Sequence, residues 1–178
     1  MGFWTAWWLL TAASVLASAG CFASKSTRAQ AMLRHGLCLL AALASLAAAA
    51  CALVARAQGM ESQVPAPLAI ASSILYALGF GVLFVELVFA LASKSLRRST
   101  AVAGGLRGGL WIGFLERLAI AASLWAHWPE GIAVVFAIKG LGRFSELKNH
   151  AAAEQFIIGT FASGLVAAAS YGLGLVLL

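Results

Sequence analysis

The chain has 178 residues, of which 62% are hydrophobic and only 10% are charged, and its mean hydropathy is +0.95. A water-soluble domain usually carries about 25% charged residues, so the composition excludes an ordinary soluble globule and favours one compact domain in lipid. The net charge of +6 comes from short basic clusters between apolar runs, without a continuous basic stripe or interleaved aromatic residues, so we expect no nucleic-acid partner.

The acidic residues are few, and all six are glutamates. The absence of aspartate from the sequence removes most metal-assisted phosphoryl-transfer chemistries, which hold their metal through aspartate. The three cysteines lie inside or at the edge of apolar runs, and none forms the short pair of a redox or zinc motif. We therefore expect neither a bound metal nor a cofactor.

Three apolar runs in the first half of the chain are long enough to cross a bilayer, which takes about 20 mostly apolar residues. The first covers about residues 3–23 and is followed by a basic connection. The second, about 36–55, is so rich in alanine that we expect it to pack closely against other helices. A polar connection with two prolines then leads to the third run, about 68–92, which carries Glu86 within its last two turns.

Three further runs follow in the second half. The fourth covers about 109–126 and ends in a tight link around Trp128 and Pro129. The fifth, about 130–147, is less apolar than the others and could instead be a re-entrant or interfacial helix. The sixth covers about 154–177. The sequence therefore predicts an all-α fold, a polytopic transmembrane bundle of six helices in a single domain.

The number of lysines and arginines alternates between high and low from one connection to the next. The five connections hold three, one, four, none and then a further group with Arg143 and Lys148. Basic residues concentrate on the cytoplasmic side of a membrane, so we expect the first, third and fifth connections in the cytoplasm and both termini outside. Tryptophans near the N-terminus and in the link at Trp125 and Trp128 fit an aromatic belt on the outer side.

Charged residues gather in the last three predicted helices. A charge inside a spanning segment costs about 2.5–3.5 kcal/mol on insertion scales, so each should find a partner in protein or water. Four polar residues follow one another at steps of four, three and four, which predicts one polar face of a helix: Lys139, Arg143, Glu146 and His150. The short link at Pro129 makes the fourth and fifth helices antiparallel neighbours, which brings Glu116 within reach of Lys139 or Arg143.

The same counting around the next turn brings Glu154 level with Glu146. We therefore predict an ionic cluster in the cytoplasmic half of the bundle, which Glu86 could join, made of Glu116, Arg117, Lys139, Arg143, Glu146 and Glu154. Gly159 and Ser163 are small residues four apart and are expected to serve helix packing. The hydroxyls of Thr160 and Ser163 could instead meet a ligand, although hydroxyls in lipid usually bond to their own backbone.

Several short pieces of the second half resemble a known family. They are Gly-Phe-Leu-Glu-Arg at 113–117, Lys139, Arg143-Phe144 with Glu146, and Glu154 followed by Ile-Ile-Gly-Thr at 157–160 and Ser163. Together they resemble the C-terminal helices of a bacterial family of multi-pass membrane proteins with no assigned function. The resemblance implies that the ionic cluster is a family feature and carries no activity with it.

The charged cluster allows two interpretations. Its members could neutralise one another and fix the register of the helices, or they could form a polar path or a pocket in which a cation meets an anion or a lipid phosphate and a glutamate carries a proton. We expect a small transporter or channel-like protein of the bacterial inner membrane that moves a proton, an ion or a small anion. Its expected partners are membrane lipids and either further copies of itself or a larger membrane complex.

Two other function classes stay open at this point. One is a non-catalytic subunit or assembly partner of a larger membrane complex, which needs a dry and fully paired cluster. The other is an intramembrane enzyme that acts on a lipid, which needs a lateral opening beside a glutamate and an arginine. The sequence has no recognisable arrangement of serine, histidine and carboxylate and no histidine-rich motif, so catalysis is the less favoured class.

Overall fold

A computed structural model describes residues 2–22, 28–62, 64–95 and 108–178 of the chain. Within these ranges the fold is all-helical, as predicted, with six α-helices and one short 3₁₀ helix. The helices are α1 (Gly2–Phe22), α2 (Arg28–Ala57), α3 (Ala66–Ser95), α4 (Gly108–Trp125), α5 (Glu130–Gly142), the 3₁₀ helix η1 (Glu146–Lys148) and α6 (His150–Leu177).

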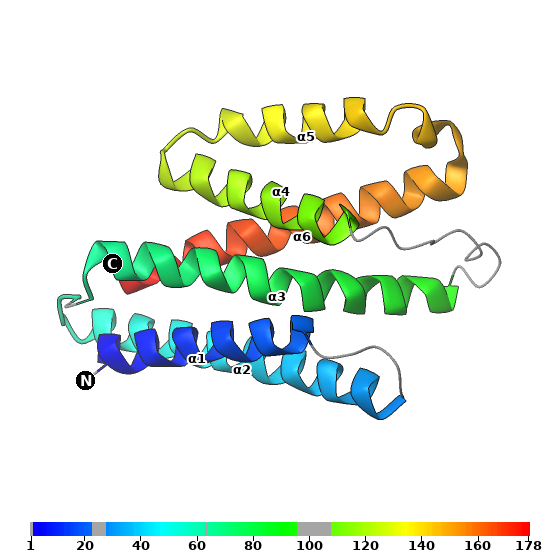
Figure 1. Cartoon of the computed structure of the whole chain (residues 1–178). Coiled ribbons are helices and arrows are strands. Elements are labelled where there is room, and N and C mark those ends of the chain that lie inside the picture. Colours follow the sequence, from blue (N-terminus) through cyan, green and yellow to red (C-terminus); the bar gives the residue numbers. More distant parts are fainter. Residues whose placement is uncertain (1, 23–27, 63, 96–107) are drawn as a thin grey trace.

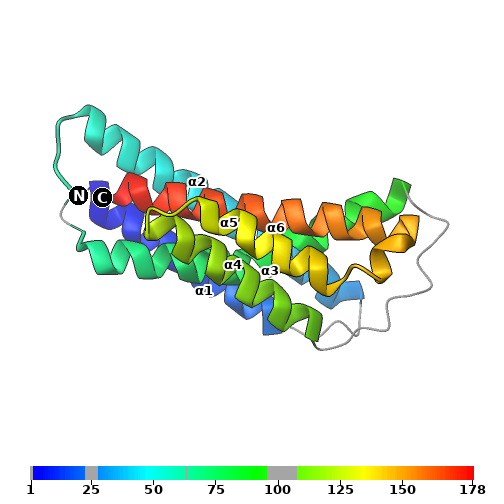
Figure 2. The same ribbon diagram turned by 90° about the horizontal axis from the view of Figure 1, so that it is seen from above.

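The helices run up and down, each antiparallel to the one before it, and both termini lie at the same end of the bundle (Figure 1). They form three tiers, with α3 and α6 in the middle, α1 and α2 on one side, and α4 and α5 on the other (Figures 1 and 2). The middle pair packs together, and α3 also packs on α1 while both α3 and α6 pack on α4. The bundle thus holds together through α3 and α6.

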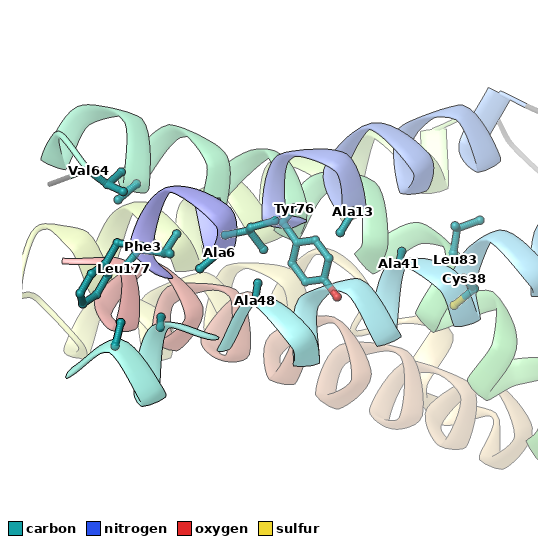
Figure 3. Close-up of a cluster of buried hydrophobic side chains, with 14 residues drawn as sticks. Phe3, Ala6, Ala13, Cys38, Ala41, Ala48, Val64, Tyr76, Leu83 and Leu177 are labelled. Atoms are coloured by element: carbon teal, nitrogen blue, oxygen red, sulfur yellow. The ribbon is translucent and has the colours of Figure 1, made fainter. Parts of the chain in front are cut away.

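Small residues build the core between α1, α2 and α3 (Figure 3). Four buried alanines line one face of the alanine-rich second helix, which confirms its predicted role in close packing: Ala41, Ala48, Ala52 and Ala55. The ring of Tyr76 reaches from α3 into this core, where its hydroxyl donates a hydrogen bond to Ser45 Oγ on α2 over 2.9 Å. A buried phenol needs such a partner, because an unsatisfied hydroxyl away from water costs free energy.

Three helices are long and apolar enough to cross a membrane, within the part of the chain that the structure describes. Their apolar segments are His35–Ala57, Ala66–Ala92 and His150–Leu177, and the described part of α1 adds a shorter apolar helix, Phe3–Leu16. Large apolar side chains on α2, such as Leu39, Leu43 and Leu46, are also exposed on its outer face. These features indicate a membrane protein.

Two helix boundaries differ from the sequence prediction in a way that matters for the charged residues. The fifth helix was predicted to reach residue 147 but ends at Gly142, and Arg143 follows as its C-cap. His150 belongs to the start of α6, where Asn149 caps the helix by accepting a hydrogen bond from Ala151 N over 2.9 Å.

The prediction that Lys139, Arg143, Glu146 and His150 share one helical face is therefore wrong. Glycines at 140 and 142 weaken the end of α5, since glycine is a poor helix former, and the asparagine cap starts a new helix instead.

Candidate functional site

A cavity of about 490 Å³ lies between α3, α4, α5 and α6. It occupies the end of the bundle where α3 and α5 finish and α4 and α6 begin, which is the end opposite the two chain termini (Figure 1). Five charged side chains line it, and we call it the charged cavity: Glu86, Glu116, Arg117, Lys139 and Arg143. The polar side chains of Gln155, Thr160 and Ser163 complete the lining from α6.

Glu116 and Lys139 form an ion pair across the α4–α5 hairpin. Glu116 Oε2 and Lys139 Nζ are 2.5 Å apart, and the two side chains are 4% and 16% exposed respectively. The predicted reach of Glu116 to Lys139 is confirmed. The lysine ammonium also lies 5.5 Å from the centroid of the Phe156 ring, so an aromatic face adds to its stabilisation.

The other carboxylate oxygen of Glu116 is buried without a hydrogen-bond partner among the described residues. Carboxylates that are removed from water usually have both oxygens bonded, because each unsatisfied buried acceptor costs free energy. Glu116 is also one of the residues that line the charged cavity. The carboxylate of Glu116 thus has one oxygen bonded to Lys139 and one oxygen that lacks a hydrogen-bond donor in the described part of the chain.

Arg117 is buried on the neighbouring face of α4, with a residue exposure of 3%. Its Nη1 donates a hydrogen bond to Ser163 Oγ on α6 over 3.4 Å, and its guanidinium carbon lies 5.5 Å from the centroid of the Phe114 ring. The side chain runs against α3 at Gly81, where an added Cβ would lie 2.4 Å from Arg117 Cδ. Glycine at this position is what leaves room for the arginine.

Two residues of α6 that the sequence assigned to packing stand at the wall of the charged cavity. A Cβ on Gly159 would lie 3.0 Å from Phe89 Cζ, so this glycine lets α6 approach α3 closely, as expected. Ser163 does more than pack, because it accepts the bond from Arg117. The hydroxyl oxygen of Thr160 is buried and has no hydrogen-bond partner within the described part of the chain.

The remaining predicted residues lie in different surroundings. Glu86 is half-buried and lines the charged cavity from α3, and Arg143 lines it from the exposed turn after α5. Glu154 is exposed on the first turns of α6 and does not contribute to the lining. The side chain of Glu146 lies outside the described part of the structure. The structure thus brings together five of the seven charged residues that the sequence selected.

Sequence reasoning missed Gly81, Gln155 and the two phenylalanines of the cavity wall, Phe89 and Phe156. A signal existed for Gln155, which precedes Gly159 by four residues and Ser163 by eight and so shares their face of α6. No comparable signal marked Gly81, because the long connection between α3 and α4 leaves their relative register open.

No protein-family model, curated protein or solved structure matches the chain. The charged cavity is therefore the feature of this chain that indicates a function. Its volume is within the range of about 300–1,000 Å³ that is usual for small-ligand sites. Three cationic and two anionic side chains line it, which leaves a formal excess of one positive charge beside two hydroxyls and an amide. Such a lining is suited to a small anion.

Proposed function

We propose that this protein is a multi-pass protein of the bacterial inner membrane that binds and transports a small oxyanion through the charged cavity. The three long apolar helices and the antiparallel order of all six support a chain that crosses the membrane repeatedly. An α-helix satisfies its backbone hydrogen bonds internally, which is what a segment that crosses lipid requires.

The balance of charge in the cavity supports an anionic ligand. Lys139 is already paired with Glu116, yet two arginines line the same space and Glu86 is the other carboxylate there. Guanidinium groups present forked donors that match the oxygens of a carboxylate, phosphate or sulfonate. Ionisable residues inside a membrane bundle are costly, and they commonly mark ligand or ion pathways.

The cavity itself favours transport over a purely structural network. Charges that only fixed helix register would be expected to pack against one another without leaving a space of about 490 Å³. The single observation that carries the proposal is this combination of a buried ion pair, a buried arginine and a ligand-sized space at one end of the bundle.

The test is anion flux into liposomes that contain the purified protein. Vesicles of zwitterionic lipid remove anionic headgroups as competing ligands, and the probes are inorganic phosphate and methanesulfonate. The test variant is the double substitution Glu116→Gln with Lys139→Met, which removes both charges and leaves no buried carboxylate unpaired. The matched control is Lys148→Met, because Lys148 is exposed on η1 and lies outside the cavity lining.

We expect flux with the wild type and with Lys148→Met, and its loss in the double variant at equal amounts of folded protein. Flux that is the same in all three proteins would place the path elsewhere. No flux of either probe in any protein, combined with a lower thermal stability of the double variant, would mean that the cluster holds the helices together. Flux in zwitterionic vesicles that added anionic lipid suppresses would point to a lipid headgroup as a ligand of the same cavity.

A further inference from the structure

We propose that the transported anion enters together with a proton, and that Glu116 is the residue that carries this proton. The inference rests on the proposed anion transport and adds the co-transported species. It starts from an observation on one side chain, which is nearly fully buried, bonded to Lys139 through Oε2, and without a partner at Oε1 among the described residues.

The first step concerns competition for Lys139. An anion in the charged cavity is attracted to the ammonium of Lys139, which is bonded to Glu116 and lies at the wall of the cavity. If the anion forms an ion pair with this ammonium, the carboxylate of Glu116 loses its counter-ion. A buried and unpaired carboxylate is strongly disfavoured, and such a group takes up a proton instead.

The second step is the balance of charge. A proton from water forms an O–H bond on Glu116, while the anion replaces the carboxylate as the counter-ion of Lys139. One negative and one positive charge have entered, so the net charge of the cavity does not change. Thr160 lines the same cavity, and its buried hydroxyl oxygen has no hydrogen-bond partner in the described residues.

The other charged groups around the cavity do not take this role. Glu86 on α3 is less buried than Glu116, and the groups on α4 and after α5 are the cations Arg117 and Arg143. α6 contributes Gln155, Thr160 and Ser163 to the lining, while its acidic residue Glu154 is exposed and outside it. Glu116 is thus the carboxylate whose ionised form depends directly on Lys139.

The test uses methanesulfonate as the probe, because this anion stays ionised at neutral and mildly acidic pH and cannot bring a proton itself. Liposomes with the full-length protein contain a trapped pH-sensitive dye, and a potassium ionophore holds the membrane potential at zero. An inward methanesulfonate gradient should then acidify the lumen with the wild type. The key variant is Glu116→Gln, and the matched control is Glu154→Gln, because Glu154 is exposed on α6 and lies outside the cavity lining.

We expect Glu116→Gln to move methanesulfonate without acidifying the lumen, and Glu154→Gln to acidify it like the wild type. Anion entry into wild-type vesicles without a change of pH would overturn the coupling and leave anion transport standing. Acidification that persists in Glu116→Gln would overturn the assignment to Glu116. Absence of anion entry in the wild type would overturn both proposals. If Glu116→Gln fails to fold, Glu116→Asp serves in its place and should retain the coupling, and its loss there would also contradict the proposal.

Discussion

At the scale of single residues, the contact between Gly81 and Arg117 makes the sharpest prediction. Replacing Gly81 with alanine puts a methyl group 2.4 Å from Arg117 Cδ and 2.6 Å from Nε, so the buried side chain must shift. Overpacking of this kind costs about 1–3 kcal/mol, which exceeds the gain of about 1 kcal/mol from replacing glycine in a helix. We expect Gly81→Ala to lower the unfolding temperature measured in detergent.

The control for this prediction is Gly172→Ala on α6, where an added Cβ meets nothing within 4 Å. The same chemical change should there be neutral or stabilising, because alanine is the better helix former. Equal stabilisation by both substitutions would show that Arg117 does not lie against α3 in this position.

Some of the contacts between single residues could be predicted from their spacing in the sequence, and others could not. The Glu116–Lys139 pair was predictable because the short turn at Pro129 connects their two helices and so fixes which residues of α4 and α5 lie level with each other. The contact of Arg117 with Gly81 was not, because no short turn connects their helices. Glu154 was wrongly expected at the cavity because the extra turn of η1 intervenes between α5 and α6.

At the scale of elements, the turn between α4 and α5 sets the geometry of the hairpin that holds this ion pair. His127 has a φ of 54°, in the left-handed region, and two backbone bonds close the end of α4. Trp128 N donates to Ser123 O over 2.9 Å and His127 N to Leu124 O over 3.0 Å, which is the pattern of a Schellman motif. Glycine is the residue that this position prefers.

We therefore expect His127→Gly to stabilise the protein. A side chain in the left-handed region costs about 1–2 kcal/mol, and the greater freedom of glycine in the unfolded chain takes back roughly 0.5–1 kcal/mol, so a net gain of about 0.5–1 kcal/mol remains. The measurement is the unfolding temperature in detergent. His127→Ala keeps the Cβ and should give no such gain; an equal gain in both would attribute the effect to loss of the imidazole.

The number of helices was predictable from the apolar runs, but their ends were not. The sixth helix begins at His150, four residues before the predicted start, and the second begins at Arg28, eight residues before it. Apolar runs mark what contacts lipid or core, whereas a helix continues into polar sequence until a cap or a weak helix former stops it. Long basic side chains at a helix end can reach interfacial water, which lets the helix extend past the apolar run.

At the scale of the whole molecule, the position of the charged cavity can be compared with the distribution of basic residues along the sequence. The first, third and fifth connections with the helix turns beside them contain nine of the twelve lysines and arginines, whereas the second and fourth contain only Arg56. Which helices would pair was not predictable, because the contact between α3 and α6 joins distant parts of the chain. Both termini lie at the opposite end of the bundle from the cavity (Figure 1), so the charge rule predicts that the cavity faces the cytoplasm in the proposed inner-membrane location.

This orientation can be tested at α5, the shortest α-helix in the described part of the chain. Its 13 residues reach about 20 Å at 1.5 Å per residue, less than the hydrocarbon thickness of about 30 Å, so crossing requires local thinning or a turn that enters the membrane. His127 and Ser145 are exposed at its two ends. In a cysteine-free background, we expect an impermeant maleimide to label His127→Cys in intact cells, and to label Ser145→Cys only in inverted vesicles.

The turn between α2 and α3 lies at the same end of the bundle as the link between α4 and α5 (Figure 1). Gln58 is exposed in that turn and is the control for the outer side, so Gln58→Cys should be labelled in intact cells. Labelling of both ends of α5 from one side would make it a re-entrant or interfacial helix, and the cavity would then lie beside the bilayer surface. Labelling of Ser145→Cys alone in intact cells would show that the bundle has the opposite orientation in the membrane. The basic residues would then lie outside, and the charge rule on which the orientation rests would fail for this protein.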